Sequence, residues 1–334
     1  MGQGAYILGC EGQTLNAAEA AFFRQAQPWG FILFARNVDN PAQLRQLTDD
    51  LRTAVGRDAP VLIDQEGGRV QRMRAPHWRE WLPPLDQVDL AGEHAARSMW
   101  LRARLIAEEL MSVGIDVNCA PSGDIAGADT HVFLQNRCYG RDTDSVTKIA
   151  RAVAEGLMAG GVLPVPKHIP GHGRANLDSH LSVPHVDVDQ ATLQAQDFAP
   201  FRALNDLSLG MTAHIIFGAI DDRPATISPP VIQMIREDIG FQGVLMTDDI
   251  SMEALDGDVA TRSAAAIAAG CDVVLHCNGK LTEMEQVAAA AGRMQAAAQG
   301  RADAALAARP SGQPIDIKAA EAELQVLLKD QAFV

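Results

Sequence analysis

Short apolar runs recur along the chain, each bounded by glycine, proline or polar residues. Such a run, about four residues long and without regular polar alternation, is typical of a strand that is buried on both faces. We therefore predict a buried strand at each of them. The runs are Ala5–Leu8, Phe31–Phe34, Val61–Ile63, Asp116–Asn118, Leu163–Pro166, Gly210–Ala213, Val244–Thr247 and Asp272–Leu275.

Amphipathic stretches lie between these runs. In Gly92–Val113, apolar residues such as Met99, Leu105 and Leu110 recur at nearly helical intervals. Asp142 or Asp144 could cap the start of the following helix, because a short carboxylate accepts from the free amides of a first turn. The predicted helices are Asn16–Gln25, Pro41–Val55, Gly92–Val113, Asp144–Ala159, Thr192–Leu204, Pro229–Glu237, Ala260–Ala269, Leu281–Ala308 and Ile317–Leu328.

The alternation of strands and helices predicts a single-domain α/β fold, a (β/α)8 barrel of TIM type whose strands need not be regular. An open doubly wound sheet is the alternative, but no G-x-G-x-x-G motif follows the first predicted strand, which disfavours a dinucleotide site. The segment RPSGQP at 309–314 predicts a hinge to a terminal helix. We thus expect a catalytic barrel over residues 1–308 and a C-terminal helical tail over residues 309–334, packed on the barrel.

Composition narrows the possible partners. Of the 334 residues, 47% are apolar and 21% are charged, as in ordinary globular proteins. The net charge of −14 repels phosphate backbones and anionic lipids, so we expect binding neither to nucleic acid nor to a membrane. The chain starts without a secretory signal pattern, and its five cysteines form no C-x-x-C pair. We expect reduced, mostly buried thiols, a cytoplasmic location and no cofactor.

Polar side chains that could take part in catalysis or ligand binding follow four of the predicted strands. They are the segments DQEGGRVQR at 64–72 and KHIPGHG at 167–173, His214, and the pair Asp248 and Asp249. In a (β/α)8 barrel the carboxyl ends of the strands meet at one face, which carries the active site. We therefore expect these segments to surround one site.

The adjacent Asp248 and Asp249 end an otherwise apolar run. Successive side chains of a strand point to opposite faces, so one carboxylate can face a pocket while the other caps or pairs outside it. A carboxylate presented rigidly to a substrate is the functional interpretation. A helix N-cap is the structural alternative.

A second candidate pair is Asp178 and His180. Residues two apart in an extended loop share a face, so the carboxylate could hydrogen-bond the imidazole and raise its pKa. Such a histidine would be a good proton shuttle near neutral pH. An ordinary surface histidine is the alternative.

Histidines gather between Lys167 and His185, which raises the alternative of a zinc site. Their spacing matches no compact zinc motif, so we expect no metal. Asp64, Arg72 and Lys167 are either salt-bridged structural residues or groups that bind a polar ligand such as a sugar.

Taken together, these motifs resemble glycoside hydrolase family 3, and within it the single-domain bacterial cytoplasmic β-N-acetylhexosaminidases of the NagZ type. The resemblance rests on DQEGGRVQR, on KHIPGHG followed by DSH, and on MTDDISM. The stretches GFILFARN, NRCYGRD and MTAHIIFGAIDDRPAT support it. The motifs stand in the family's order and cover roughly residues 5 to 280.

The resemblance implies a retaining hydrolase that forms a covalent glycosyl–enzyme intermediate. It places Asp248 on the nucleophile, His180 on the general acid/base and Asp178 on the partner of that histidine. It also implies a set of sugar-binding residues, namely Asp64, Arg72, Arg137, Lys167 and His168.

The implied substrate is a terminal β-linked N-acetylglucosamine on peptidoglycan fragments that carry 1,6-anhydro-N-acetylmuramic acid, with or without peptides. The implied process is cell-wall recycling in the cytoplasm, which bears on cell shape and division. A β-N-acetylglucosaminide phosphorylase is an alternative, since an imidazole does not repel phosphate as a carboxylate would. A zinc-dependent amidohydrolase and a non-catalytic sugar sensor are further alternatives. We infer no obligate protein partner.

Overall fold

The structure, a computed structural model, describes residues 2–128, 130–175, 183–329, 331 and 333. Within these residues eight parallel strands form one sheet, in the order β5-β4-β3-β2-β1-β10-β9-β7. The strands are β1 (Gly4–Leu8), β2 (Pro28–Leu33), β3 (Val61–Ile63), β4 (Val117–Asn118), β5 (Leu163–Pro164), β7 (Leu209–Met211), β9 (Val244–Asp249) and β10 (Val273–His276).

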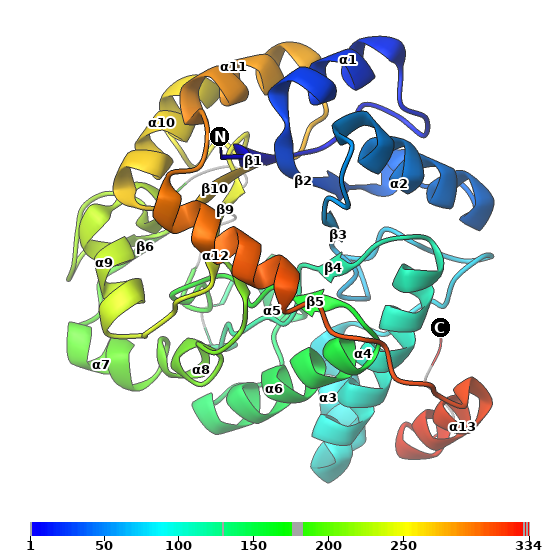
Figure 1. Ribbon diagram of the computed structural model, residues 1–334. Helices are drawn as coiled ribbons and strands as arrows, with labels where there is room; N and C mark the ends of the chain where they lie inside the picture. Colours follow the sequence, from blue (N-terminus) through cyan, green and yellow to red (C-terminus); the bar gives the residue numbers. More distant parts are fainter. Residues whose placement is uncertain (1, 129, 176–182, 330, 332, 334) are drawn as a thin grey trace.

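The sheet closes on itself just beyond its two outer strands. The N–H of Ile169 donates to the carbonyl oxygen of Met211 (2.7 Å), and the N–H of Ala213 donates to the carbonyl oxygen of Ile169 (2.8 Å). These bonds join the segment after β5 to the last residue of β7 and the residues that follow it, and a barrel results (Figure 1). The predicted (β/α)8 fold is confirmed, and each predicted strand overlaps a strand of the barrel.

Helices follow the strands and surround the barrel (Figure 1). The α6 helix begins at the predicted cap, because the side chain of Asp142 accepts a hydrogen bond from the N–H of Ser145 (2.9 Å). Short 3-10 turns occur at Ala35–Asn37, Gly92–His94 and Ala225–Ile227. The helices are α1 (Ala17–Ala26), α2 (Pro41–Val55), α3 (Pro84–Ala91), α4 (Ala95–Ser112), α5 (Val132–Gln135), α6 (Thr143–Ala159), α7 (Gln190–Ala195), α8 (Ala199–Arg202), α9 (Pro229–Glu237), α10 (Val259–Ala269), α11 (Leu281–Ala291), α12 (Ala296–Ala307) and α13 (Ile317–Leu327).

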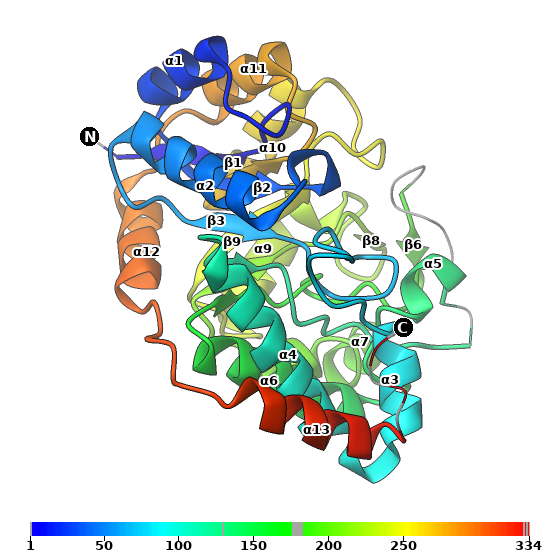
Figure 2. The same ribbon diagram turned by 90° about the vertical axis from the view of Figure 1, so that its right-hand side faces the viewer.

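The α12 helix covers the amino-terminal end of the barrel (Figures 1 and 2). Just before it, the N–H of Met294 donates to the carbonyl oxygen of Gln3 next to β1 (2.8 Å). Within it, Arg301 pairs with Asp272 directly before β10 (2.6 Å). Figure 2 shows α5 and the strand pair of β6 (His185–Val186) and β8 (Ile216–Phe217) at the opposite end. A site at the carboxyl-terminal end is therefore not covered by α12.

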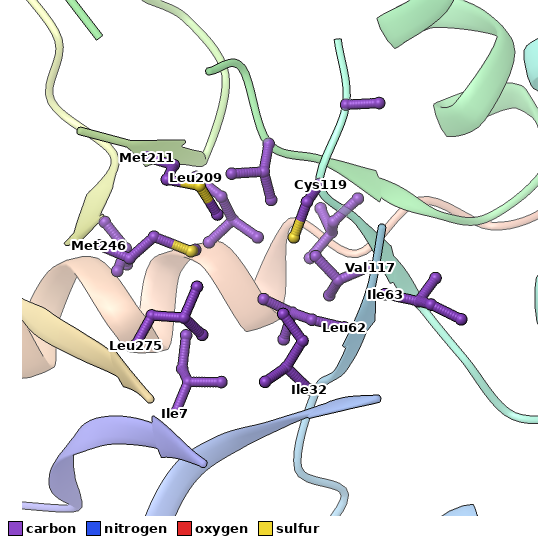
Figure 3. Close-up of a cluster of buried hydrophobic side chains, with 14 of the residues drawn as sticks. Ile7, Ile32, Leu62, Ile63, Val117, Cys119, Leu209, Met211, Met246 and Leu275 are labelled. Atoms are coloured by element: carbon purple, nitrogen blue, oxygen red, sulfur yellow. The ribbon is translucent and has the colours of Figure 1, made fainter. Parts of the chain in front are cut away.

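Apolar side chains from different strands fill the barrel interior (Figure 3). Each of them is at most 3% exposed, and burying one such side chain contributes about 1.5–3 kcal/mol. This packed layer gives the polar residues above it a rigid base. The side chains that point toward one another are Ile7, Ile32, Leu62, Met211 and Leu275.

Two of the predicted helices are each divided in two. The prediction Leu281–Ala308 is wrong as one helix, because Gly292 adopts a φ of 67° and ends α11 before α12 begins. The prediction Thr192–Leu204 covers the end of α7 and all of α8, which are separated by a turn in which the N–H of Phe198 bonds the carbonyl oxygen of Leu193. Sequence periodicity missed α3, α5, β6 and β8, since none exceeds 8 residues.

The segment after α12 returns along the side of the barrel and packs against α4 (Figure 2). Arg97 of α4 forms an ion pair with Glu323 of α13 (2.7 Å), and the ring of Phe333 lies against Trp81 (5.4 Å between centroids). None of the helices formed by the described residues has both the length and the apolar character that crossing a membrane requires.

Candidate active site

A cavity of about 230 Å³ lies where the carboxyl ends of the barrel strands meet. Ile32, Met211 and Leu275, which belong to the barrel core, also line this cavity (Figure 3). The structure brings around it every described residue that the family resemblance assigned to catalysis or sugar binding, whereas His214, which the sequence analysis also expected there, does not line it. The assigned residues that border the cavity are Asp64, Arg72, Arg137, Lys167, His168 and Asp248.

The turn after β3 supplies several of these groups. Asp64 and Glu66 are two residues apart, a spacing that puts side chains of extended backbone on the same side. Gln65 between them closes the turn, because its Oε1 accepts a hydrogen bond from the N–H of Arg72 (2.9 Å). This bond brings Arg72 close to Asp64, and Nη2 of Arg72 pairs with Oδ2 of Asp64 at 3.1 Å.

A buried arginine supports the same turn from behind. Arg102 is 2% exposed, and it donates to the carbonyl oxygen of Glu66 and to Oε1 of Gln87 (2.8 Å). Gly67 has a φ of 106°, and a Cβ there would lie 1.6 Å from Nη2 of Arg102. Only glycine fits at this position, so the turn is fixed on its buried side.

The charged groups form one connected cluster beside the cavity. Nζ of Lys167 lies 2.7 Å from both Oδ1 of Asp64 and Oε1 of Glu66. Arg137 donates two hydrogen bonds to Glu66, at 2.8 and 3.0 Å. Asp64, Arg72 and Lys167 are therefore ion-paired, as the structural interpretation expected, and they also border the cavity, so sugar binding by them stays a prediction.

The cluster is ionised at neutral pH. Burial alone would raise the pKa of Glu66, but Arg137 and Lys167 lower it to about 2. Burial likewise opposes ionisation of Asp64, and Lys167 and Arg72 hold its pKa well below the usual range. Burial disfavours the charged form of Lys167, yet Asp64 and Glu66 hold its pKa above the usual range. Three cations and two carboxylates leave one net positive charge at this wall of the cavity.

His168 joins this cluster to a second buried carboxylate. Its Nδ1 lies 2.7 Å from Oδ2 of Asp124, and its Nε2 lies 3.4 Å from Nη2 of Arg137. Asp124 also accepts the backbone N–H of His172 (2.7 Å). Burial, and secondarily the nearby His168, lower the pKa of His172 to about 4, so that its ring is neutral at pH 7.

Asp248 and Asp249 differ in what their carboxylates do. Oδ1 of Asp248 accepts the backbone N–H of Asp249 (2.8 Å), and the side chain borders the cavity. The carboxylate of Asp249 also borders the cavity, but it accepts from the N–H and hydroxyl of Ser251 (3.0 and 2.7 Å) and from the N–H of Cys277 (3.2 Å). Asp249 thus stabilises the turn after β9, and Asp248 is the carboxylate available for chemistry.

The surroundings of Asp248 favour its charged form. Burial would raise its pKa, but the nearby His168 and His214 rings and the N–H of Asp249 bring it below the ordinary value. The His214 side chain itself bonds the carbonyl oxygen of Asp249 (3.0 Å) and Thr226 (2.8 Å). It therefore supports the end of β9 from below and does not line the cavity.

Residues 7–307 match the glycosyl hydrolase family 3 N-terminal domain. The chain belongs to glycoside hydrolase family 3. Within the family, it is 38% identical to a β-hexosaminidase of Methylococcus capsulatus over 273 residues, which are 80% of each chain. It is 36% identical to a β-hexosaminidase of Pseudomonas aeruginosa over 285 residues, which are 83% of each chain.

A solved structure leads to the same family. The NagZ of Neisseria gonorrhoeae, in complex with N-trifluoroacetyl-D-glucosamine, superposes with a TM-score of 0.84 and 29% identity. The match covers 98% of this chain and 99% of that one. The family 3 protein described here is therefore a glycoside hydrolase of the β-hexosaminidase type.

The predicted and the observed residues of this family 3 site differ in part, and the sequence analysis overlooked two of the buried carboxylates. Asp178 and His180 fall outside the described residues, so their assigned roles stay predictions. His185 lies on β6, where it pairs with Asp187 (3.1 Å). The sequence analysis did not single out Glu66 or Asp124. The spacing of Glu66 from Asp64 was an available signal, whereas Asp124 bonds a residue 44 positions away and has no local signature.

Metal-binding side chains do not form a cluster in the part of the chain that the structure describes. No cluster of three or more His, Cys, Asp or Glu side chains there could hold an ion. The cysteines are free and buried, and burial raises the pKa of each, for Cys10 to about 12. Membership of family 3 favours sugar hydrolysis over the zinc-dependent amidohydrolase considered from the sequence.

Proposed function

We propose that this family 3 enzyme is a retaining exo-β-N-acetylglucosaminidase with Asp248 as nucleophile. The observation that carries the proposal is an ionised carboxylate beside a cavity whose opposite groups can hydrogen-bond sugar hydroxyls. The ligand of the gonococcal NagZ, N-trifluoroacetyl-D-glucosamine, supports an N-acylated glucosamine as the sugar.

In the first step, an oxygen of Asp248 would form a bond to the anomeric carbon as the bond to the leaving oxygen breaks. The transition state carries positive charge on the sugar ring, which the carboxylate stabilises. His180, held by Asp178, would give its proton to the leaving oxygen. The products of this step are a glycosyl ester of Asp248 and the free alcohol of the aglycone.

In the second step, the neutral His180 would take a proton from a water molecule whose oxygen attacks the anomeric carbon. The ester bond breaks, and Asp248 departs as a carboxylate. Two inversions at the same carbon return the β configuration. The enzyme regains its protonated histidine and releases N-acetylglucosamine.

The charged cluster would hold the sugar during both steps. Asp64 can accept hydrogen bonds from hydroxyl groups, and Arg72, Arg137 and Lys167 can donate them. His168 offers its Nε2 on the same side of the cavity. Because these groups are already paired with one another, little reorganisation is needed when a sugar binds.

The natural substrate would be a peptidoglycan fragment, N-acetylglucosamine linked to 1,6-anhydro-N-acetylmuramic acid with or without a peptide. This assignment and the accompanying role in cytoplasmic cell-wall recycling rest on the resemblance of the motifs. The curated relatives share the hexosaminidase activity in name.

A pair of chromogenic substrates tests the activity. The β-N-acetylglucosaminide should be hydrolysed and the matching β-glucoside should not. Release of sugar 1-phosphate only in phosphate buffer would reassign the acceptor and make the enzyme a phosphorylase. A 5-fluoro glycoside should label Asp248 in the intact enzyme and nothing in the Asp248→Ala variant, and a label on another residue would refute the nucleophile.

The leaving group tests the acid. His180→Ala should slow hydrolysis of the natural disaccharide by about 10²–10⁴-fold, because its leaving oxygen needs a proton. An aryl glycoside with an acidic phenol leaves without that help and should be affected far less. Equal losses on both substrates would argue against His180 as the acid.

A further inference from the structure

Asp124 lies behind the sugar-binding wall and contacts two segments of the site. It is fully buried and belongs to none of the sequence motifs that carried the functional assignment. Oδ1 accepts the backbone N–H of His172 (2.7 Å) and of His168 (3.4 Å). Oδ2 lies 2.7 Å from Nδ1 of the His168 ring and accepts the hydroxyl of Ser122 (3.3 Å).

These contacts determine the protonation state of the Asp124 carboxyl group and the hydrogen-bonding role of its two oxygens. Burial opposes ionisation of this carboxyl group, but the His168 ring and the His172 N–H hold its pKa below the ordinary value. An ionised carboxylate only accepts hydrogen bonds. At a separation of 2.7 Å, Nδ1 of His168 must therefore carry a proton.

The other nitrogen of the same ring faces a donor. Nε2 of His168 lies 3.4 Å from Nη2 of Arg137, and a guanidinium has donors only. A proton on Nε2 would point at this cation, whereas a lone pair there can accept from it. Asp124 on one side and Arg137 on the other thus select the same neutral tautomer, with the proton on Nδ1 and a lone pair on Nε2.

We propose that Asp124 is a positioning residue, which fixes the tautomer of His168 so that the one lone pair of Nε2, which the Arg137 guanidinium approaches only to 3.4 Å, can accept from a sugar hydroxyl. This inference rests on the proposed function for its consequence, and on the hydrogen-bond geometry for the tautomer itself. With this tautomer, Nε2 of His168 supplies a hydrogen-bond acceptor to the site. The neighbouring Arg72, Arg137 and Lys167 can only donate hydrogen bonds. Asp64 would otherwise have to accept from every hydroxyl at this wall.

An asparagine at position 124 tests the idea at nearly constant shape. Its amide oxygen would face the backbone N–H groups of His168 and His172, which both donate to Oδ1 of Asp124 in the wild type. Its NH₂ group would then face Nδ1 of the ring. Two donors repel, so the proton should move to Nε2, and the acceptor toward the sugar should be lost. When the aspartate of a serine-protease triad is replaced by asparagine, kcat falls because the histidine adopts the wrong tautomer.

The first measurement is the tautomer of His168, by NMR of protein labelled with ¹⁵N in histidine side chains. His168→Gln identifies the signal by its loss. At neutral pH the wild-type ring should be protonated on Nδ1 and bare on Nε2, and Asp124→Asn should invert this pattern. A wild-type ring that carries its proton on Nε2, or on both nitrogens, would overturn the proposal. The wild-type measurement needs no activity and no folded variant of Asp124.

The second measurement is kinetic and uses the chromogenic β-N-acetylglucosaminide. Asp124→Asn should lower kcat/KM by about 10- to 100-fold, the range expected for one hydrogen bond to a polar substrate group. The matched control is Ser122→Ala, which removes the hydroxyl's two bonds with Asp124 (3.3 Å to Oδ2 and 3.3 Å from the backbone N–H) but leaves the charge of Asp124 toward the ring. It should stay within about threefold of the wild type. An equal loss in Ser122→Ala would show that any disturbance of this network has the same effect, and would refute the tautomer role.

The double variant shows whether Asp124 acts through His168. In the His168→Gln background there is no tautomer to set, so adding Asp124→Asn should cost little more activity. Full additivity of the two losses would overturn the proposal. Inactivity of the wild type on this substrate would instead refute the proposed function, while the NMR result would still decide the tautomer.

Discussion

Buried carboxylates paired with arginine side chains occur at both ends of the barrel. At the amino-terminal end, Asp272 binds Arg236 (2.7 Å) and Arg301 (2.6 Å), and it accepts the N–H of Leu245 (2.9 Å). At the carboxyl-terminal end, Glu66 binds Arg137 (2.8 Å) and Lys167 (2.7 Å). Both carboxylates are less than 5% exposed. The chemistry of the groups therefore does not distinguish the ends.

The difference lies in what borders each cluster. The oxygens of Asp272 bond a backbone N–H of β9 and arginines of α9 and α12, and α12 covers this end (Figure 1). The cluster of Glu66 lies against the wall of the cavity, with Asp64, Arg137 and Lys167 on its surface. Ion pairs at the ends of buried strands thus mark a site only where space for a ligand remains beside them. The two ends should respond differently to matched substitutions.

The largest effect is expected from Asp248→Ala. Removing the proposed nucleophile should lower kcat on the β-N-acetylglucosaminide by roughly three or more orders of magnitude, as loss of a covalent catalyst does elsewhere. The midpoint of urea unfolding should hardly change, because this side chain makes few bonds to the fold. Asp249→Asn is the control, and it should lower stability more and activity less, since it disturbs the bonds to Ser251 and Cys277. The reverse order would exchange the roles of the two aspartates.

Glu66→Gln should affect both activity and stability. The variant leaves Arg137 and Lys167 without their shared carboxylate, and removing one partner of a buried pair costs about 3–5 kcal/mol. The freed cations should also hold the sugar less well, so kcat/KM should fall by about 10–100-fold. Denaturant titration and steady-state kinetics on the same preparation measure the two effects. A loss of stability alone would make Glu66 a purely structural residue like Asp272.

The sequence predicted the barrel well because its strands carry their own signal. The run Val61–Ile63 is buried on both faces and reads as a strand without any knowledge of its neighbours. Helix lengths were less secure, because a single glycine at 292 ends α11 inside an alanine-rich stretch. The α5 helix, which has 4 residues, offers too few positions for any period to appear.

The residues of the candidate site were predictable where they directly follow a strand. They were not predictable where their role depends on a contact with a residue distant in the sequence. Asp248 and Lys167 follow apolar runs directly and could be found by position alone. Asp124 acquires its importance only through the His168 ring, to which the closed barrel brings it. No local pattern marks such a partner.

Asp272→Asn gives the counterpart at the amino-terminal end. Its two arginines would face a neutral amide, so the free energy of unfolding should fall by about 3 kcal/mol. Activity per folded molecule should stay unchanged, because the bonding partners of Asp272, namely Arg236, Leu245 and Arg301, do not line the cavity. Unfolding curves together with kcat/KM, scaled to the folded fraction, make the comparison. A drop in kcat/KM as large as that of Glu66→Gln would remove the distinction between the ends.

The pH dependence of stability should differ in sign between the ends, with smaller effects. The folded pKa of Glu66 is lowered from 4.5 to about 2, so its contribution is present above the unfolded pKa and is lost as the pH falls through that window. Burial raises the pKa of Asp116, at the amino-terminal end, although Arg309 opposes this, so its contribution is lost as the pH rises. Between pH 3.8 and 4.5, the ordinary pKa values of Asp116 and Glu66, Glu66→Gln should therefore flatten the rise of unfolding free energy with pH, and Asp116→Asn should steepen it. Each change should be at most about 1.4 kcal/mol per pH unit. Denaturant titrations of both variants and the wild type at several pH values measure these slopes, and a change of the same sign in both variants would contradict the difference between the two ends.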